Sequence, residues 1–95
     1  MAIKEILIKP ITLDGKRFRP SDWADRLYYA LATYDHQGKP VFNPLVCLKH
    51  ENDLKCFAIN PKLEEEEPMT YEFLMDFANS NELTITDQDH SPIDL

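Results

Sequence analysis

Two cysteines and a histidine lie close together in the chain and are the first residues to examine for chemistry. Cys47 and Cys56 flank His50 and a short polar segment. If the two flanking apolar runs pair as a hairpin whose turn lies midway between the cysteines, the thiols face each other, with Cβ atoms about 4.5–5.5 Å apart. That register allows a disulfide, a redox switch or part of a metal site.

The alternative is that both cysteines are reduced thiols, buried as small hydrophobic side chains. A structural zinc site needs four ligands, usually from two closely spaced pairs, and the histidines at 36, 50 and 90 are scattered. None of these histidines has a Ser or Cys in register as a nucleophile. We therefore predict no catalytic residue, no metal and no cofactor.

A second chemically rich segment runs from residue 17 to residue 27. It combines three arginines, one tryptophan, one proline and the start of a predicted helix. Helix N-termini attract anions, and arginine makes forked hydrogen bonds to carboxylates or phosphates. Tryptophan and arginine also dominate protein–protein hot spots. The candidate binding residues are Arg17, Arg19, Asp22, Trp23 and Arg26, with Phe42 and Pro44 as a second patch.

A purely structural interpretation of the same segment is a well-made helix start. Ser21 then caps the helix, Trp23 fills space in the core, and Arg26 pairs with Asp22 one turn earlier. The sequence leaves both interpretations open.

The same segment carries a resemblance to a known family. Residues 19–26 read Arg-Pro-Ser-Asp-Trp-Ala-Asp-Arg. They resemble the Arg-Pro-Ser-Asp-Trp-Ala-Glu-Arg-type motif of small proteobacterial domains of unknown function. Residues 42–46 look like a second, Tyr-Ser-Pro-Tyr-Val-like signature, and the resemblance extends over most of residues 3–86. It implies a single-domain bacterial protein of the cytosol and carries no activity with it.

Hydrophobic periodicity predicts the elements that position these residues. Apolar runs bounded by turn residues predict strands at 3–8, 45–49, 54–59 and 83–86. Apolar residues spaced by three and four predict two helices, at 21–34 and 68–78. Their predicted buried stripes are Ala24, Leu27, Tyr28, Leu31 and Tyr34 in the first, and Met69, Phe73, Leu74, Phe77 and Ala78 in the second.

This order of elements predicts an α+β fold, a ferredoxin-like βαββαβ sandwich with two helices on one face of a four-stranded antiparallel sheet. Residues 1–86 form a single domain in this interpretation, and residues 87–95 form a polar, frayed tail.

Composition narrows the classes of function. The 95 residues carry a net charge of −7, which disfavours a nucleic-acid partner, and the two glycines exclude glycine-rich phosphate loops. Residues 60–95 hold ten acidic side chains and one basic one, so we expect one strongly acidic end. No segment has the length and hydropathy of a signal peptide or a membrane span, which predicts a cytoplasmic protein without a membrane partner.

These observations favour a non-catalytic protein-binding or regulatory module. Its partner is an unknown protein, or a second copy bound through the open face of the sheet. One alternative is a small-anion or metabolite-binding domain that uses the basic segment before the first helix. A third is an enzyme of unrecognised type.

Overall fold

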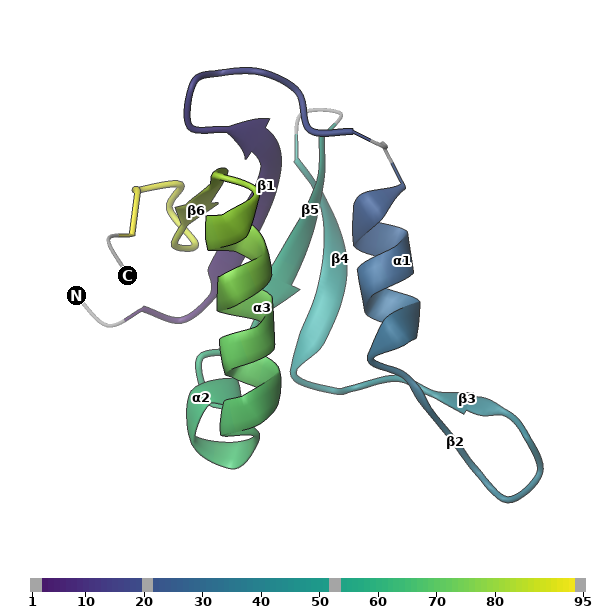
Figure 1. Cartoon of the computed structure of the whole chain (residues 1–95). Helices are drawn as coiled ribbons and strands as arrows, with labels where there is room; N and C mark the ends of the chain where they lie inside the picture. Colours follow the sequence, from purple (N-terminus) through teal and green to yellow (C-terminus); the bar gives the residue numbers. More distant parts are fainter. Residues whose placement is uncertain (1–2, 20–21, 52–53, 94–95) are drawn as a thin grey trace.

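The computed structural model describes residues 3–19, 22–51 and 54–93 (Figure 1). The predicted cap Ser21 and two residues of the predicted hairpin loop, 52–53, lie outside the described residues. The elements in chain order are β1 (Ile6–Thr12), α1 (Trp23–Ala30), β2 (Thr33–Tyr34), β3 (Pro40–Val41), β4 (Val46–Glu51), β5 (Leu54–Ile59), α2 (Leu63–Glu66), α3 (Pro68–Ser80) and β6 (Leu83–Thr86). The chain is therefore an α+β protein, as predicted.

Four strands form one antiparallel sheet in the order β4-β5-β1-β6. The β4–β5 hairpin pairs Val46 with Ile59 and Glu51 with Leu54, which leaves only residues 52 and 53 between the strands. The predicted hairpin and the last predicted strand are confirmed. The short ribbon β2–β3 and the short helix α2 were not predicted.

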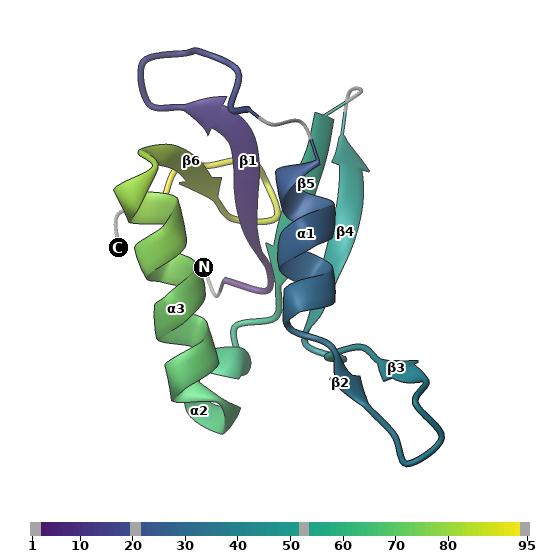
Figure 2. The same ribbon diagram turned by 45° about the vertical axis from the view of Figure 1, so that its right-hand side comes forward.

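The core lies between the sheet and the two longer helices, α1 and α3, which lie side by side over one face of the sheet (Figures 1 and 2). Alternate strand residues point toward the helices, because successive side chains of a strand point to opposite faces. The buried cluster includes Ile8 from β1, Phe57 from β5, Leu27 from α1 and Leu74 from α3.

The first strand is longer than predicted. It continues past Pro10 to Thr12, and its register with β6 shifts between Ile8 and Thr12. Proline has no N–H to donate, so an irregular stretch of the ladder accommodates it at little cost. In the turn that follows, Gly15, at φ +86°, donates its N–H to the carbonyl of Thr12 at 2.9 Å.

The first helix is shorter than predicted, because the chain turns out into the β2–β3 ribbon. Asp35 holds the ribbon turn with its Oδ1, which accepts the backbone N–H groups of Gln37 (2.8 Å) and Lys39 (2.9 Å). Gly38 takes φ +79° there, a conformation that costs glycine little. Tyr34 thus lies in β2 with 69% of its surface exposed, and the prediction that it continues the helical stripe was wrong.

The buried face of α3 also differs from the prediction. Leu74, Met75 and Ala78 are buried, whereas Met69 is 85% and Phe73 is 51% exposed. The row 69–73–77 lies one residue, and hence about 100°, round the helix from the row 74–78 that faces the sheet. The predicted core stripe was therefore wrong for two of its five members.

The face of the sheet away from the helices is not bare. Leu7, Cys56 and Ala58 on this face are buried. Lys49 pairs with Glu5 at 2.7 Å on the same side. The chain after β6 folds back past β1 (Figure 2), and Lys9 Nζ lies 2.7 Å from Nδ1 of His90.

The segment after β6 has regular contacts with the sheet, although the sequence predicted a frayed tail. Asp87 closes a turn by accepting the N–H groups of Asp89 (2.9 Å) and Ser91 (3.0 Å). Ile93 then donates its N–H to the carbonyl of Ile85 at 3.0 Å and packs against the core cluster. One apolar residue with a strand to pair against is enough to hold such a segment.

Within the described ranges, none of the helices is long and apolar enough to cross a bilayer.

Candidate functional site

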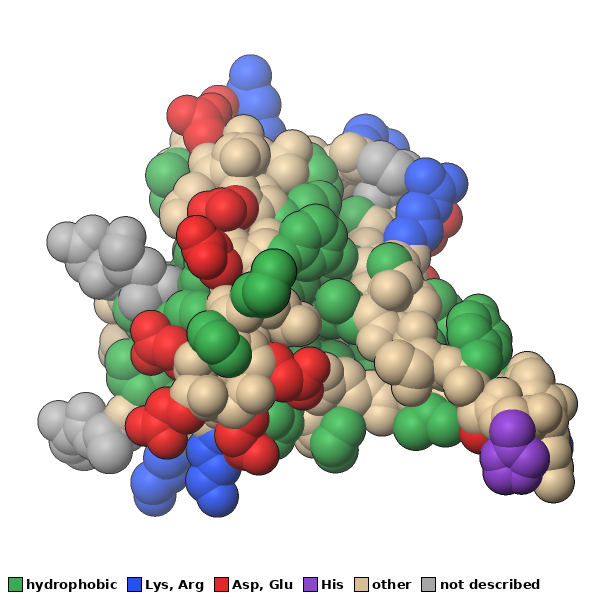
Figure 3. Space-filling view, turned by 60° about the horizontal axis from the view of Figure 1, so that its bottom comes forward, with side chains coloured by type: hydrophobic (Ala, Val, Ile, Leu, Met, Phe, Trp, Pro, Cys, Tyr) green, Lys and Arg blue, Asp and Glu red, His purple; other side chains and the backbone are tan. Residues whose placement is uncertain are grey.

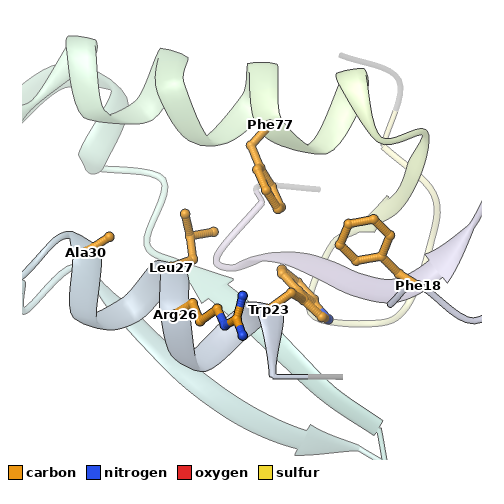
Figure 4. Close-up of a pocket in the computed structure, with 6 residues that line it drawn as sticks. All are labelled: Phe18, Trp23, Arg26, Leu27, Ala30 and Phe77. Carbon is orange, nitrogen blue, oxygen red and sulfur yellow. The ribbon is translucent and has the colours of Figure 1, made fainter. Parts of the chain in front are cut away.

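An apolar groove opens between α1 and α3 and has a volume of about 310 Å³ (Figure 4). Its walls come from three parts of the chain: the loop before α1, the inner face of α1, and α3. The lining residues are Phe18, Trp23, Arg26, Leu27, Ala30 and Phe77. Because α1 and α3 both rest on the sheet, the width of the groove is set by the fold rather than by a loop.

Three aromatic rings form one end of the groove. Trp23 and Phe77 stack at 6.0 Å between centroids with planes 18° apart. Phe18 meets both edge-on, at 5.8 Å from Trp23 and 6.2 Å from Phe77. Such pairs contribute about 0.5–1.5 kcal/mol each beyond their buried area. The rings are therefore a fixed wall, already ordered before anything binds.

Trp23 has a polar atom that the fold leaves unsatisfied. Its side chain is only 4% exposed, and its indole Nε1 has no hydrogen-bond partner among the described residues. A buried donor without a partner costs about 1–3 kcal/mol. Trp23 is thus part of the wall of the groove and also fills space in the core, as the structural interpretation of the segment expects.

The predicted cations differ in their relation to this groove. Arg26 reaches its rim and pairs through Nε with Oδ2 of Asp22 at 2.9 Å, as predicted. Arg17 and Arg19 are exposed on either side of Phe18 and do not line the groove. The side chain of Asp22 makes no capping bond to the helix start.

The second predicted patch forms a separate cluster at the base of the β2–β3 ribbon. Phe42 stacks on Tyr28 at 4.7 Å with planes only 4° apart and meets Tyr29 edge-on at 5.2 Å. A smaller hollow of about 190 Å³ lies beside it, and Pro44 is part of its lining. Across this hollow, Asn43 donates through Nδ2 to Oε2 of Glu67 at 3.0 Å.

The cysteines do not face each other. Cys47 lies opposite Ala58 and Cys56 opposite Lys49, because the β4–β5 turn is one residue further along than the symmetric placement predicted. Both are thiols, Cys56 buried and Cys47 exposed, so the alternative of two buried thiols holds for Cys56 alone. Over the described part of the chain, no group of three or more His, Cys, Asp or Glu side chains is placed to hold a metal ion.

One titratable group near α3 has a shifted pKa. Burial raises the pKa of Tyr71 above its ordinary value, and the negative charge of Glu64 on α2 raises it further. Tyr71 packs against the core cluster from the start of α3 and does not line the groove. The shift is therefore a feature of packing beside an acidic helix, and it supplies no acid or base to the groove.

Sequence reasoning missed four lining residues as site residues: Phe18, Leu27, Ala30 and Phe77. Phe18 lay within the segment singled out, but only its charged neighbours were chosen. Phe77 was assigned to the core. One signal in the sequence could have indicated Phe77. The second helix has five predicted core positions, more than one buried helix face holds, so some of these side chains had to lie outside the core.

The comparisons with known proteins place the chain in a family. Residues 2–88 match the model of DUF3579, described as a protein of unknown function, so the chain belongs to this family. A solution structure described as the first structural representative of its family is 36% identical to the chain. The match covers 99% of this chain and 87% of that one, with a TM-score of 0.91. Among curated proteins no match is found.

Proposed function

We propose that the protein is a non-catalytic binding module and that the groove between α1 and α3 receives an apolar side chain of a protein partner. The observation that carries this proposal is the open groove itself, about 310 Å³ of apolar space walled by ordered rings. A fold that needed these rings only for its core would close over them, because exposed apolar surface lowers stability and solubility.

The groove is a stronger candidate than the open sheet face for contact with a partner. The strand residues Leu7 and Ala58 on that face are already buried within the monomer. By contrast, the groove continues onto exposed apolar side chains of α3. A protein rather than a nucleic acid is the partner, since the net charge of −7 repels phosphates.

The test compares capture of a partner from a lysate of the source cells by wild type and two matched variants. Ala30→Glu places a charged side chain in the groove at an exposed helix position, so the fold is expected to survive. Gln37→Glu adds the same charge in the exposed ribbon turn, away from the groove. We expect a stoichiometric partner to be held by wild type and Gln37→Glu and lost by Ala30→Glu. Equal capture by all three proteins would remove the groove from the proposal.

A third variant locates the basic residues in the same experiment. The double substitution Arg17→Ala and Arg19→Ala removes two exposed cations beside Phe18. If the partner has acidic groups near Phe18, we expect it to dissociate faster from the double variant than from wild type. A lower salt concentration should also be enough to release it from the double variant. If capture is unchanged, these arginines belong only to the helix start.

A second candidate function is binding of a small apolar acid. It is favoured by one observation, the apolar groove with the guanidinium of Arg26 at its rim. A carboxylate on an apolar body would place the body in the groove and the charge beside Arg26, and the groove volume is at the lower end of ligand pockets, about 300–1,000 Å³. A screen of small carboxylic acids by thermal shift tests it, because a ligand stabilises the folded state by mass action.

The finer description of the fold belongs with this proposal. We propose a ferredoxin-like βαββαβ arrangement built from β1, α1, β4, β5, α3 and β6, in which β2–β3 and α2 are additions to the common pattern. The strand order β4-β5-β1-β6 supports it. A cytoplasmic location is likewise a proposal, supported by the two thiols.

A further inference from the structure

Exposed apolar side chains on α3 lie beyond the groove. Met69 and Phe73 are exposed and precede the groove residue Phe77 at intervals of four residues. Residues four apart lie one above the other on a helix, about 6 Å apart along its axis, so the three side chains form a stripe about 12 Å long. We call Met69, Phe73 and Phe77 the α3 stripe.

Acidic side chains border the α3 stripe. Glu72 and Asp76 are exposed on the side of α3 turned away from α1, and Glu64, Glu65 and Glu66 are exposed on α2 at the lower end of the stripe. Figure 3 shows hydrophobic side chains gathered over α3 and in the trough toward α1, with acidic side chains beside them. Arg26 at the far rim is paired with Asp22, so its charge is locally offset.

Resting on the proposed function, we propose that the partner segment is a basic amphipathic helix. Its apolar face lies along the α3 stripe with one side chain in the groove, and its Lys or Arg side chains meet Glu72 and Asp76. The spacing of the stripe by helical turns suits a helix laid alongside, whose own apolar residues recur every three or four positions.

The charge of the molecule distinguishes this occupant from a second copy of the chain. Two copies joined through the α3 stripe would bring Glu72 and Asp76 of each near those of the other, between molecules of net charge −7. Like charges placed together at an interface oppose association. A basic partner removes that repulsion and adds attraction that falls with ionic strength.

Two designed helical peptides provide the test. Both carry leucines at i, i+3, i+4 and i+7; one has lysines on both flanks of this face and the other has glutamates. Binding of the fluorescein-labelled peptides to the full chain is followed by anisotropy at low and high salt. We expect the lysine peptide to bind at least about tenfold more tightly than the glutamate peptide, with a preference that shrinks as salt is raised.

Substitutions in the chain locate the contact. Phe73→Glu is expected to weaken the lysine peptide about tenfold or more, because it interrupts the stripe at its centre. Leu13→Glu is the control, an apolar residue of another element that is 73% exposed against 51% for Phe73, and it is expected to change nothing. The double variant Glu72→Lys and Asp76→Lys is expected to exchange the preference of the two peptides. Circular dichroism confirms that each variant is folded.

The outcomes separate this inference from the function on which it rests. If neither peptide binds, or if both bind equally, the basic-helix inference is overturned. The binding module still stands in that case if Ala30→Glu loses its captured partner. A wild-type dimer in sedimentation that Phe73→Glu converts to monomer would overturn the inference in favour of a second copy. If Leu13→Glu weakens the lysine peptide as much as Phe73→Glu, the α3 stripe is not the contact.

Discussion

Two aromatic clusters of three rings each flank α1, and they differ in what they leave open. Phe18, Trp23 and Phe77 come from distant parts of the chain and wall a groove of about 310 Å³. Tyr28, Tyr29 and Phe42 come from one stretch of 15 residues (28–42) and pack against each other at the base of the ribbon, with one stacked pair and two edge-on pairs.

The difference distinguishes a candidate binding surface, the groove cluster, from a cluster that only stabilises the base of the ribbon. In the ribbon cluster the flat stack of Phe42 on Tyr28 uses the ring faces inside the monomer. In the groove cluster Trp23 and Phe77 are held by helices that rest on the sheet, Phe18 comes from the loop before α1, and apolar space beside the rings stays accessible. Rings fixed by tertiary structure lose little entropy when a partner arrives, which favours binding.

The largest effect is expected from removing the buried wall of the groove. Trp23→Ala deletes a side chain that is only 4% exposed, and it should lower the free energy of unfolding by about 3–5 kcal/mol. Trp23→Phe keeps most of the ring volume and removes an N–H that has no partner, so it should cost clearly less. Urea unfolding followed by circular dichroism measures both. Equal costs for the two variants would show that the indole N–H makes a bond after all.

A smaller and more local effect is expected in the ribbon cluster. Phe42→Ala removes a half-buried ring from the stack on Tyr28 and should cost about 1–2 kcal/mol. The loss should appear as faster hydrogen exchange and proteolysis in residues 33–41, with little change in the sheet. Tyr34→Ala, an exposed side chain of the same ribbon, is the control. Uniform loosening of the whole domain would mean that the cluster belongs to the main core.

A charge at the rim of the groove should affect binding more than stability. Arg26→Gln breaks an exposed pair with Asp22 spaced by four residues, worth about 0.3–0.5 kcal/mol. Thermal unfolding should therefore shift by a few degrees at most. If a carboxylate of the partner binds beside Arg26, the same substitution lowers the affinity of that complex, because it removes the positive charge at the rim. A large loss of stability would instead make Arg26 a structural residue.

The smallest effect is expected at alkaline pH, on the core side of α3. Tyr71 has its pKa raised, first by burial and then by Glu64. The unfolded chain ionises this phenol near its ordinary pKa of about 10, whereas the folded chain keeps the proton to higher pH. Stability from this group is intact below about pH 10 and is lost as the pH rises through the folded pKa. Tyr71→Phe should show a smaller decline in urea-unfolding stability between about pH 9 and pH 11, and an unchanged decline would contradict the shift.

Most of the strands could be predicted from the sequence, whereas the helix faces could not. The hairpin from 46 to 59 and the last strand follow from short β-branched and apolar runs between turn residues, which act locally. The first helix was extended too far, because an apolar residue at 34 fits the helical spacing equally well whether the chain continues or turns into a ribbon. The Asp35–Gly38 turn decides between the two, because Asp35 and Gly38 close the ribbon there.

The sequence pointed to a segment that does contribute to the groove, but it favoured the charged residues of that segment over the aromatic ones. Charged residues from 17 to 26 were chosen because their chemistry is readable from type and spacing. The groove instead depends on Phe77, which lies far along the chain and faces Trp23 only after both helices dock on the sheet. The register of the β4–β5 hairpin shows the same limit. The sequence placed the turn midway between Cys47 and Cys56, but the turn lies one residue further along, so the two cysteines do not face each other.

Local patterning of apolar, polar and turn residues was sufficient for the α+β class, the acidic C-terminal third and the pairing of Asp22 with Arg26. Each of these depends on residues within a few positions of one another, or on composition alone. The groove and the exposure of Met69 and Phe73 were decided by how α1 and α3 rotate and space themselves on the sheet. Which apolar side chains become buried depends on the packing of elements far apart in the chain, and no single segment contains that information.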